Sequence, residues 1–81
     1  MPAERVEMRH SLFFSTIADA EKAEAKITET VLDLVDSYQT NDGESGSIEV
    51  RFFTDSALDD WMQRYIVRAT RPNSYTFNRD E

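Results

Sequence analysis

His10 is the only histidine in the chain, and it could serve as a general acid or base because imidazole titrates near neutral pH. That chemistry needs a carboxylate or a nucleophile that converges on the ring. Ser11 is adjacent in an alternating segment, so its hydroxyl should point to the opposite face of a strand. We therefore interpret His10 as a hydrogen-bonded core or edge residue. We expect no catalytic residue and no enzymatic activity.

Residues 36–49 are rich in oxygen ligands, and their chemistry could be calcium binding. An EF-hand loop has a glycine at its sixth position and a bidentate glutamate at its twelfth. If Gly46 takes the sixth position, the twelfth is Phe52. If Gly43 takes it, the first ligand is Tyr38. Neither register suits calcium, so we expect a solvated turn, no metal site and no cofactor.

Charge is distributed unevenly, and this is the strongest signal in the chain. The net charge is −7, and residues 19–49 carry all of it, with nine acids against two lysines. Both flanking segments are neutral. A localised negative field attracts a basic partner and repels nucleic acid and anionic membranes. We therefore expect a basic protein partner, with no direct binding of nucleic acid or membrane.

Eight of these acids could form a functional surface. Carboxylates four residues apart on a helix are separated by about 6 Å along its axis, close to the spacing of phosphates along one DNA strand. Asp33 and Asp36, in the last turns of the first predicted helix, also oppose its macrodipole, so helix stability does not explain their presence. We expect this surface to bind a partner in place of DNA; the alternative is a merely solvated face. The acidic set comprises Glu21, Glu24, Glu29, Asp33, Asp36, Asp42, Glu44 and Glu49.

Aromatic side chains could stack on the bases of single-stranded nucleic acid if a basic groove surrounded them. Trp61 and Tyr65 have helical spacing, and we interpret them as core residues. Arg64, Arg68 and Arg71 share one side of the same predicted helix and could form a small basic patch. Because the concentrated charge of the chain is acidic, we favour the core interpretation.

A strand and a long helix are predicted to come first. Residues 5–14 alternate with a period of two, which predicts a strand. Thr16 and Asp19 have the spacing of a capping box. Helical periodicity then runs from Ile17 to about Tyr38. Its apolar stripe comprises Ala20, Ala23, Ile27, Val31, Leu34 and Tyr38.

A loop and a second strand follow. Residues 40–47 contain both glycines of the chain and predict a loop. Residues 48–53 alternate again, with Ile48, Val50 and Phe52 toward the first helix. The simplest connection is a right-handed crossover between two parallel strands.

A second helix is predicted from the spacing of Ser56 and Asp59, which forms another capping box, with Asp55 as an alternative cap. This helix should run to about Ala69, because Pro72 prevents its continuation. Its buried residues are expected to be Leu58, Trp61, Tyr65 and either Met62 or Ile66.

The predicted fold is α+β: a small sheet of about three strands, in strand–helix–strand–helix–strand order, covered on one face by two helices. Residues 75–77 supply the third, edge strand, and residues 78–81 are expected to be a mobile tail. We expect a single domain, because 81 residues are too few for two. We expect it to be folded, because 40% of its residues are apolar, too many for a disordered acidic tail. We also expect a cytoplasmic location and a monomer or small homo-oligomer, since no signal sequence, long apolar run or cysteine is present.

The segment Val50–Trp61 resembles the strand, Asp/Ser cap and Leu-x-x-Trp helix of small phage-encoded anti-CRISPR proteins. Size, acidity and element order resemble that group too. The resemblance implies an inhibitor that binds a CRISPR effector or similar bacterial defence complex in the host cytoplasm and blocks DNA capture by phosphate mimicry. The alternative is an interaction or regulatory module with an apolar patch or edge strand, supplied by Phe13, Phe53 or residues 75–77.

Overall fold

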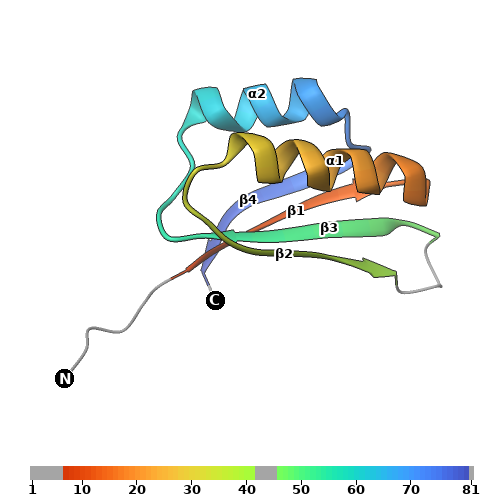
Figure 1. The fold of residues 1–81 in the computed structure, drawn as a ribbon, viewed down its shortest axis with the longest axis horizontal. Helices are drawn as coiled ribbons and strands as arrows, with labels where there is room; N and C mark the ends of the chain where they lie inside the picture. Colours follow the sequence, from red (N-terminus) through yellow and green to blue (C-terminus); the bar gives the residue numbers. More distant parts are fainter. Residues whose placement is uncertain (1–6, 42–45, 81) are drawn as a thin grey trace.

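The structure, a computed structural model, describes residues 7–41 and 46–80. These residues form two helices and four strands, in which two strands follow one another between the helices (Figure 1). In order, they are β1 (Met8–Phe14), α1 (Ile17–Thr30), β2 (Leu34–Asn41), β3 (Ile48–Thr54), α2 (Asp60–Thr70) and β4 (Ser74–Asp80).

The four strands form one sheet in the order β2-β3-β1-β4, and all its pairings are antiparallel. Strands β1 and β2 are therefore parallel to each other but separated by β3. In the same way, β1 separates β3 from β4. This connectivity is the double split β-α-β of ferredoxin-like folds. The expected parallel pairing of the first strand with residues 48–53 is wrong, because β2 reverses the chain before β3 begins.

The first helix is shorter than its periodicity suggested. It ends at Thr30, and the N–H of the extended residue Val31 donates to the carbonyl of Ile27 at 2.9 Å. Residues 34–38, expected to be helical, belong to β2 instead. Leu34 and Tyr38 are four residues apart, a spacing that fits both the helical period and the period of two, although a register shift after Leu34 places Tyr38 on the open face of the sheet, opposite to the helices. The helix prediction beyond Thr30 is therefore wrong, and local spacing could not have distinguished the two structures.

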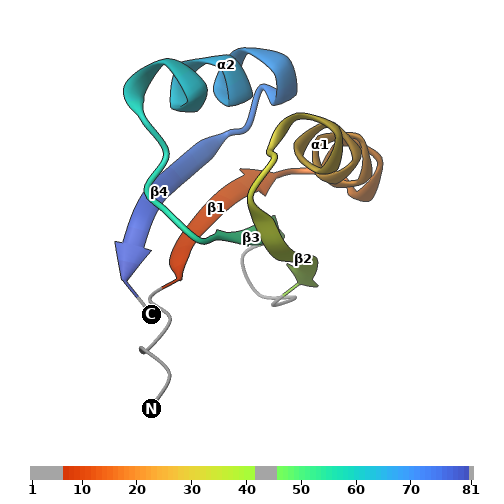
Figure 2. The same cartoon turned by 60° about the vertical axis from the view of Figure 1, so that its left-hand side comes forward.

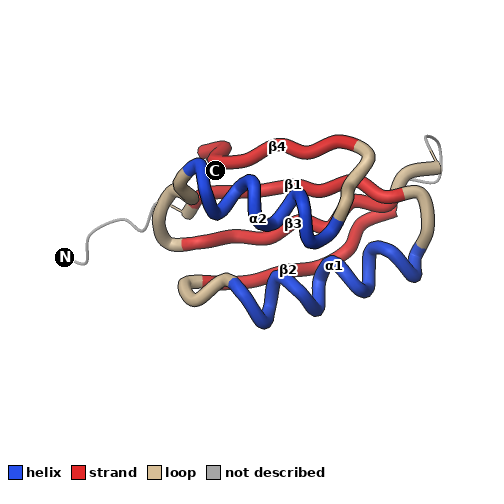
Figure 3. Tube along the Cα trace, turned by 90° about the horizontal axis from the view of Figure 1, so that it is seen from above, coloured by secondary structure: helices blue, strands red, loops and turns tan. Residues whose placement is uncertain are grey.

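Both helices cover one face of the sheet (Figures 2 and 3), as expected. Ala20 and Ala23, both fully buried, are small enough for α1 to lie close to the strands. Ile48, Val50 and Phe52 of β3 point toward the helices, as predicted, and Leu12 and Phe14 of β1 join them in the core. The core comprises Leu12, Phe14, Ala20, Ala23, Ile27, Val31, Ile48, Val50, Phe52, Leu58 and Ile66. The opposite side of the sheet, which we call the open face, is covered by no described element (Figure 2).

The second helix begins later than predicted. Its N-cap is Asp59, whose Oδ1 accepts a hydrogen bond from the N–H of Met62 at 3.1 Å. The hydroxyl of Ser56 donates instead to Asp33 Oδ2 at 2.9 Å. Ile66 is the fully buried residue of α2, whereas Trp61 is 64% and Tyr65 43% exposed. The expected burial of both aromatic residues is therefore wrong.

Strand β4 is an edge strand, as predicted, but it extends to Asp80. The expected mobile tail is wrong for residues 78–80, and Glu81 lies outside the described residues. The register between β1 and β4 shifts between Arg9 and Ser11, and Asn78 adopts a positive φ of 60° there. An irregularity of this kind has no periodic signature, which explains why the continuation of the strand was missed.

Candidate protein-binding surface

Glu24 of the acidic set is a structural side chain. It lies between α1 and the helix-facing side of β2, where Oε2 accepts from the hydroxyl of Ser37 at 3.0 Å. Its Oε1 accepts from the side-chain amide of Gln39 at 3.1 Å. This carboxylate connects the helix to the edge strand, and each of its oxygens already accepts a hydrogen bond inside the molecule.

Glu49 is also engaged, but on the open face. It forms a salt bridge with Arg51, with Nε to Oε2 at 2.9 Å and Nη2 to Oε1 at 3.0 Å. Its carboxylate also accepts from Ser11 at 2.6 Å and from Thr40 at 3.2 Å. The hydrogen bonds from Arg51 lower the pKa of the Glu49 carboxyl, although partial burial opposes them. This acid is neutralised where it lies.

The other described acids do not join these two in one ridge. Glu29 is 3.7 Å from Lys26 and highly exposed, and Glu21 is exposed on α1. Asp33 accepts from Ser56 in the α1–β2 connection. Asp36 lies opposite Phe53 on the open face and accepts from the N–H of Ser37 at 2.9 Å.

The acidic set is therefore spread over both sides of the sheet rather than along one helix. The macrodipole argument does not apply to Asp33 and Asp36, because neither residue belongs to a helix. Asp42 and Glu44 lie outside the described residues.

His10 is fully buried, and both of its ring nitrogens are engaged. Nδ1 accepts from the backbone N–H of Asn78 at 3.0 Å, and Nε2 lies 2.8 Å from Thr54 Oγ1. Burial lowers the pKa of His10 from 6.5 to about 4, and the charge of Asp33 partly opposes that shift. The imidazole is thus a satisfied core group, as the sequence suggested. In residues 7–41 and 46–80, no cluster of three His, Asp or Glu side chains could hold a metal ion.

Three of the seven large apolar side chains that are exposed in the described residues, Leu32, Trp61 and Tyr65, lie where the C-terminal end of α1 meets the beginning of α2. Leu32 is 99% and Trp61 64% exposed. The rings of Trp61 and Tyr65 are in edge contact, with centroids 6.4 Å apart. These residues surround a groove of about 600 Å³. This helix groove is lined by Thr30, Val31, Leu32, Asp33, Ser56, Leu58, Trp61, Met62 and Tyr65.

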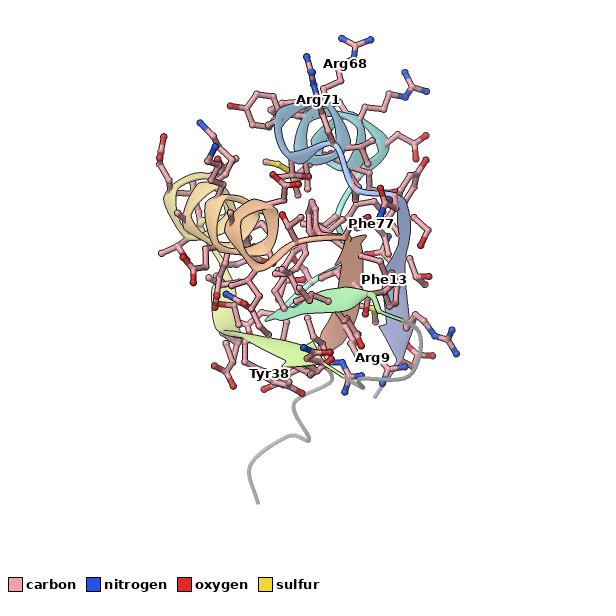
Figure 4. All side chains as sticks on the ribbon, turned by 90° about the vertical axis from the view of Figure 1, so that its right-hand side faces the viewer. Arg9, Phe13, Tyr38, Arg68, Arg71 and Phe77 are labelled. Carbon is pink, nitrogen blue, oxygen red and sulfur yellow. The ribbon has the colours of Figure 1, made fainter. Side chains whose placement is uncertain are left out.

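A second hollow, of about 350 Å³, lies on the other side of α2 beside β4. Its walls include Arg64 and Arg68, with Tyr75 and Phe77 from the strand. Arg68 points away from the sheet on the outer side of α2 (Figure 4). In the described part of the chain, Arg64 and Arg68 form no ion pair. The outer side of α2 therefore combines apolar and cationic groups.

Sequence reasoning missed this surface, although a signal for it was present. Residues 61, 64, 65 and 68 fall within about 100° of one helix face. Because Arg64 and Arg68 share that face with Trp61 and Tyr65, the face should have been assigned to solvent. Leu32 carried no comparable signal, since its exposure depends on where α1 ends.

No helix in the described residues has the length and apolar character needed to cross a bilayer. In comparisons with protein-family models, curated proteins and solved structures, the chain shows no significant match.

Proposed function

We propose that this protein is a non-enzymatic interaction module that binds a partner protein through the helix groove. The observation that carries the proposal is the exposure of Leu32 and Trp61 around one hollow. Contiguous apolar patches larger than a few hundred Å² are rare on monomeric proteins and usually mark interaction sites. Tryptophan and tyrosine are also the residue types that most often dominate binding energy at interfaces.

The helix groove is better placed for a contact than the acidic set is. Glu24 and Glu49 already satisfy hydrogen-bond donors of the same molecule. A partner would therefore gain less from either carboxylate than from one that accepts no hydrogen bond in the free protein. Leu32 and Trp61, by contrast, gain from any contact that removes their apolar surface from water.

The test is capture of partner proteins from a bacterial lysate by immobilised wild type, Leu32→Ser and Trp61→Ala. Ile17→Ala is the matched control, because Ile17 is 56% exposed but does not line the groove. We expect one partner that is lost with both groove variants, is retained with the control and remains bound at about 0.5 M salt. Circular dichroism would establish that all variants fold. Capture that is equal for wild type and Trp61→Ala would overturn the proposal.

A second proposal is the inhibitor suggested by charge: phosphate mimicry against a nucleic-acid-binding protein, such as a CRISPR effector or similar bacterial defence complex. The supporting observation is that Glu21, Glu29 and Asp36 remain exposed in a chain of net charge −7. The triple change of these residues to Lys should abolish capture of a basic partner that elutes between ~0.1 and ~0.5 M salt. Unchanged capture would rule out mimicry.

A further inference from the structure

This inference deepens the proposed function and rests on it: it concerns the chemistry of the partner at the helix groove. Aromatic side chains and arginine side chains alternate along the outer face of α2. Trp61, Arg64, Tyr65 and Arg68 lie at positions i, i+3, i+4 and i+7, so they are neighbours on one face. All four are exposed. Arginine, like tryptophan and tyrosine, is enriched at the energetic centres of interfaces.

The arginines of this face are not neutralised by an ion pair, although Asp60 precedes Arg64 by about one turn and lines the second hollow with it. In residues 7–41 and 46–80, no carboxylate forms an ion pair with Arg64, Arg68 or Arg71. Arg64 and Arg68 are four residues apart, where like charges repel one another. The helix dipole favours Arg68 and Arg71 near the C-terminal end, but Arg64 lies in the middle of α2. Ion pairing within the described residues therefore does not account for the two arginines.

The apolar and cationic parts are contiguous. Trp61 and Tyr65 border the helix groove on the side of α1. A shallow hollow lined by Trp61, Arg64, Tyr65 and Arg68 joins these rings to the arginines. Arg64 and Arg68 then border the second hollow beside β4. A segment lying across α2 would meet an apolar pocket first and two guanidinium groups next.

We infer that the partner presents an acidic segment with one large apolar anchor residue. The anchor enters the helix groove between Leu32 and Trp61. Asp or Glu side chains a few residues away pair with Arg64 and Arg68, whose planar guanidinium groups bind carboxylates through two parallel hydrogen bonds. The charge of the partner segment is thus opposite to the local charge of the α2 surface, although it has the same sign as the net charge of the whole protein.

The short range of screened electrostatic interactions favours a short acidic segment over a larger polyanion at this surface. At physiological ionic strength, charges interact over about 8 Å, so a short segment meets mainly the arginines of α2. A nucleic acid or a second copy of the chain is large enough to meet the remaining field of a molecule with net charge −7.

The test is selection of random 16-residue peptides displayed on phage against the wild-type protein. We expect enriched peptides that combine Asp or Glu with an aromatic or aliphatic residue. Synthetic versions should shift the fluorescence of Trp61, which is the only tryptophan of the chain. By calorimetry, Arg64→Glu and Arg68→Glu should each weaken binding at least tenfold. The matched charge change Arg79→Glu, in β4, should alter it less than twofold.

The outcomes separate the two proposals. If Trp61→Ala abolishes binding but both arginine variants bind normally, or if the enriched peptides are neutral or basic, the inference is overturned and the proposed function stands. If no selected peptide depends on Trp61, the proposed function fails and the inference fails with it. Arg68-dependent binding of a 20-nucleotide oligo(dT) that is tighter than binding of every peptide would also overturn the inference. So would a dimer, seen by ultracentrifugation, that Arg68→Glu dissociates.

Discussion

The backbone N–H of Asn78 donates a hydrogen bond to Nδ1 of His10 over 3.0 Å. Because a backbone N–H can only donate, the neutral imidazole must carry its proton on Nε2. Nε2 therefore donates to Thr54, whose hydroxyl donates onward to the carbonyl of Ser56 at 2.6 Å. This chain joins β4, β1, β3 and the turn before α2. Because both ring nitrogens of His10 are hydrogen-bonded, the imidazole can be buried without unsatisfied polar atoms.

The buried imidazole should make stability depend on pH. The pKa of His10 is near 6.5 in the unfolded chain and about 4 in the folded protein. The unfolded state therefore binds more protons between these values, and the wild type should lose up to about 3 kcal/mol as the pH falls from 6.5 to 4. Urea unfolding at several pH values measures the free energy of unfolding of the wild type and of His10→Gln. The difference between the two values should become smaller as the pH falls from 6.5 to 4, and a difference that does not change with pH would contradict the prediction.

Asn78 should be costly to replace. Its side chain accepts from the N–H of Leu58 at 2.8 Å and donates to the carbonyl of the same residue at 2.9 Å. Its φ of 60° also disfavours residues other than Gly, Asn and Asp. Asn78→Ala should destabilise the protein by about 2–4 kcal/mol, because it loses both side-chain hydrogen bonds and strains the backbone. Asn78→Gly should destabilise it by less, because glycine loses the same bonds but adopts a positive φ without strain. Denaturant midpoints for the two variants test this order, and equal losses would refute the strain component.

Glu24 and Glu21 give a matched pair on α1. Glu24→Ala should destabilise the protein by about 1–2 kcal/mol, since it removes the acceptor for Ser37 and Gln39. Glu21→Ala should change stability by less than about 0.5 kcal/mol, because the side chain is exposed. Thermal unfolding of the two variants measures the difference. Equal effects would mean that Glu24 is merely solvated.

Trp61 should matter little for folding. Trp61→Ala should cost less than about 1 kcal/mol, because the side chain is 64% exposed. Phe52→Ala should cost about 3–5 kcal/mol, because Phe52 is fully buried in β3. Chemical unfolding of both variants provides the comparison. A large loss of stability for Trp61→Ala would show that the ring belongs to the core and would remove the basis of the helix groove as a binding surface.

The sequence by itself determined those features that depend on neighbours along the chain. Thr16 is the N-cap of α1, as predicted, since the N–H of Asp19 donates to Thr16 Oγ1 at 3.1 Å. Alternation placed β1 and β3 correctly, because side chains of a strand alternate between its faces whatever lies beyond it. Asp60 and Arg68 at the ends of α2 follow the helix dipole, which is also a local effect.

Tertiary structure decided the rest. Leu34 and Tyr38 fit two periods equally well, and pairing with β3 selected the strand. That choice moved Asp36 to the open face and placed Glu24 against β2, so the acidic set separated. Likewise, Trp61 lies in water because α2 turns Ile66 and Met62 toward the core. Which face of an element is covered depends on packing between distant segments, and that information is absent from the spacing of neighbours.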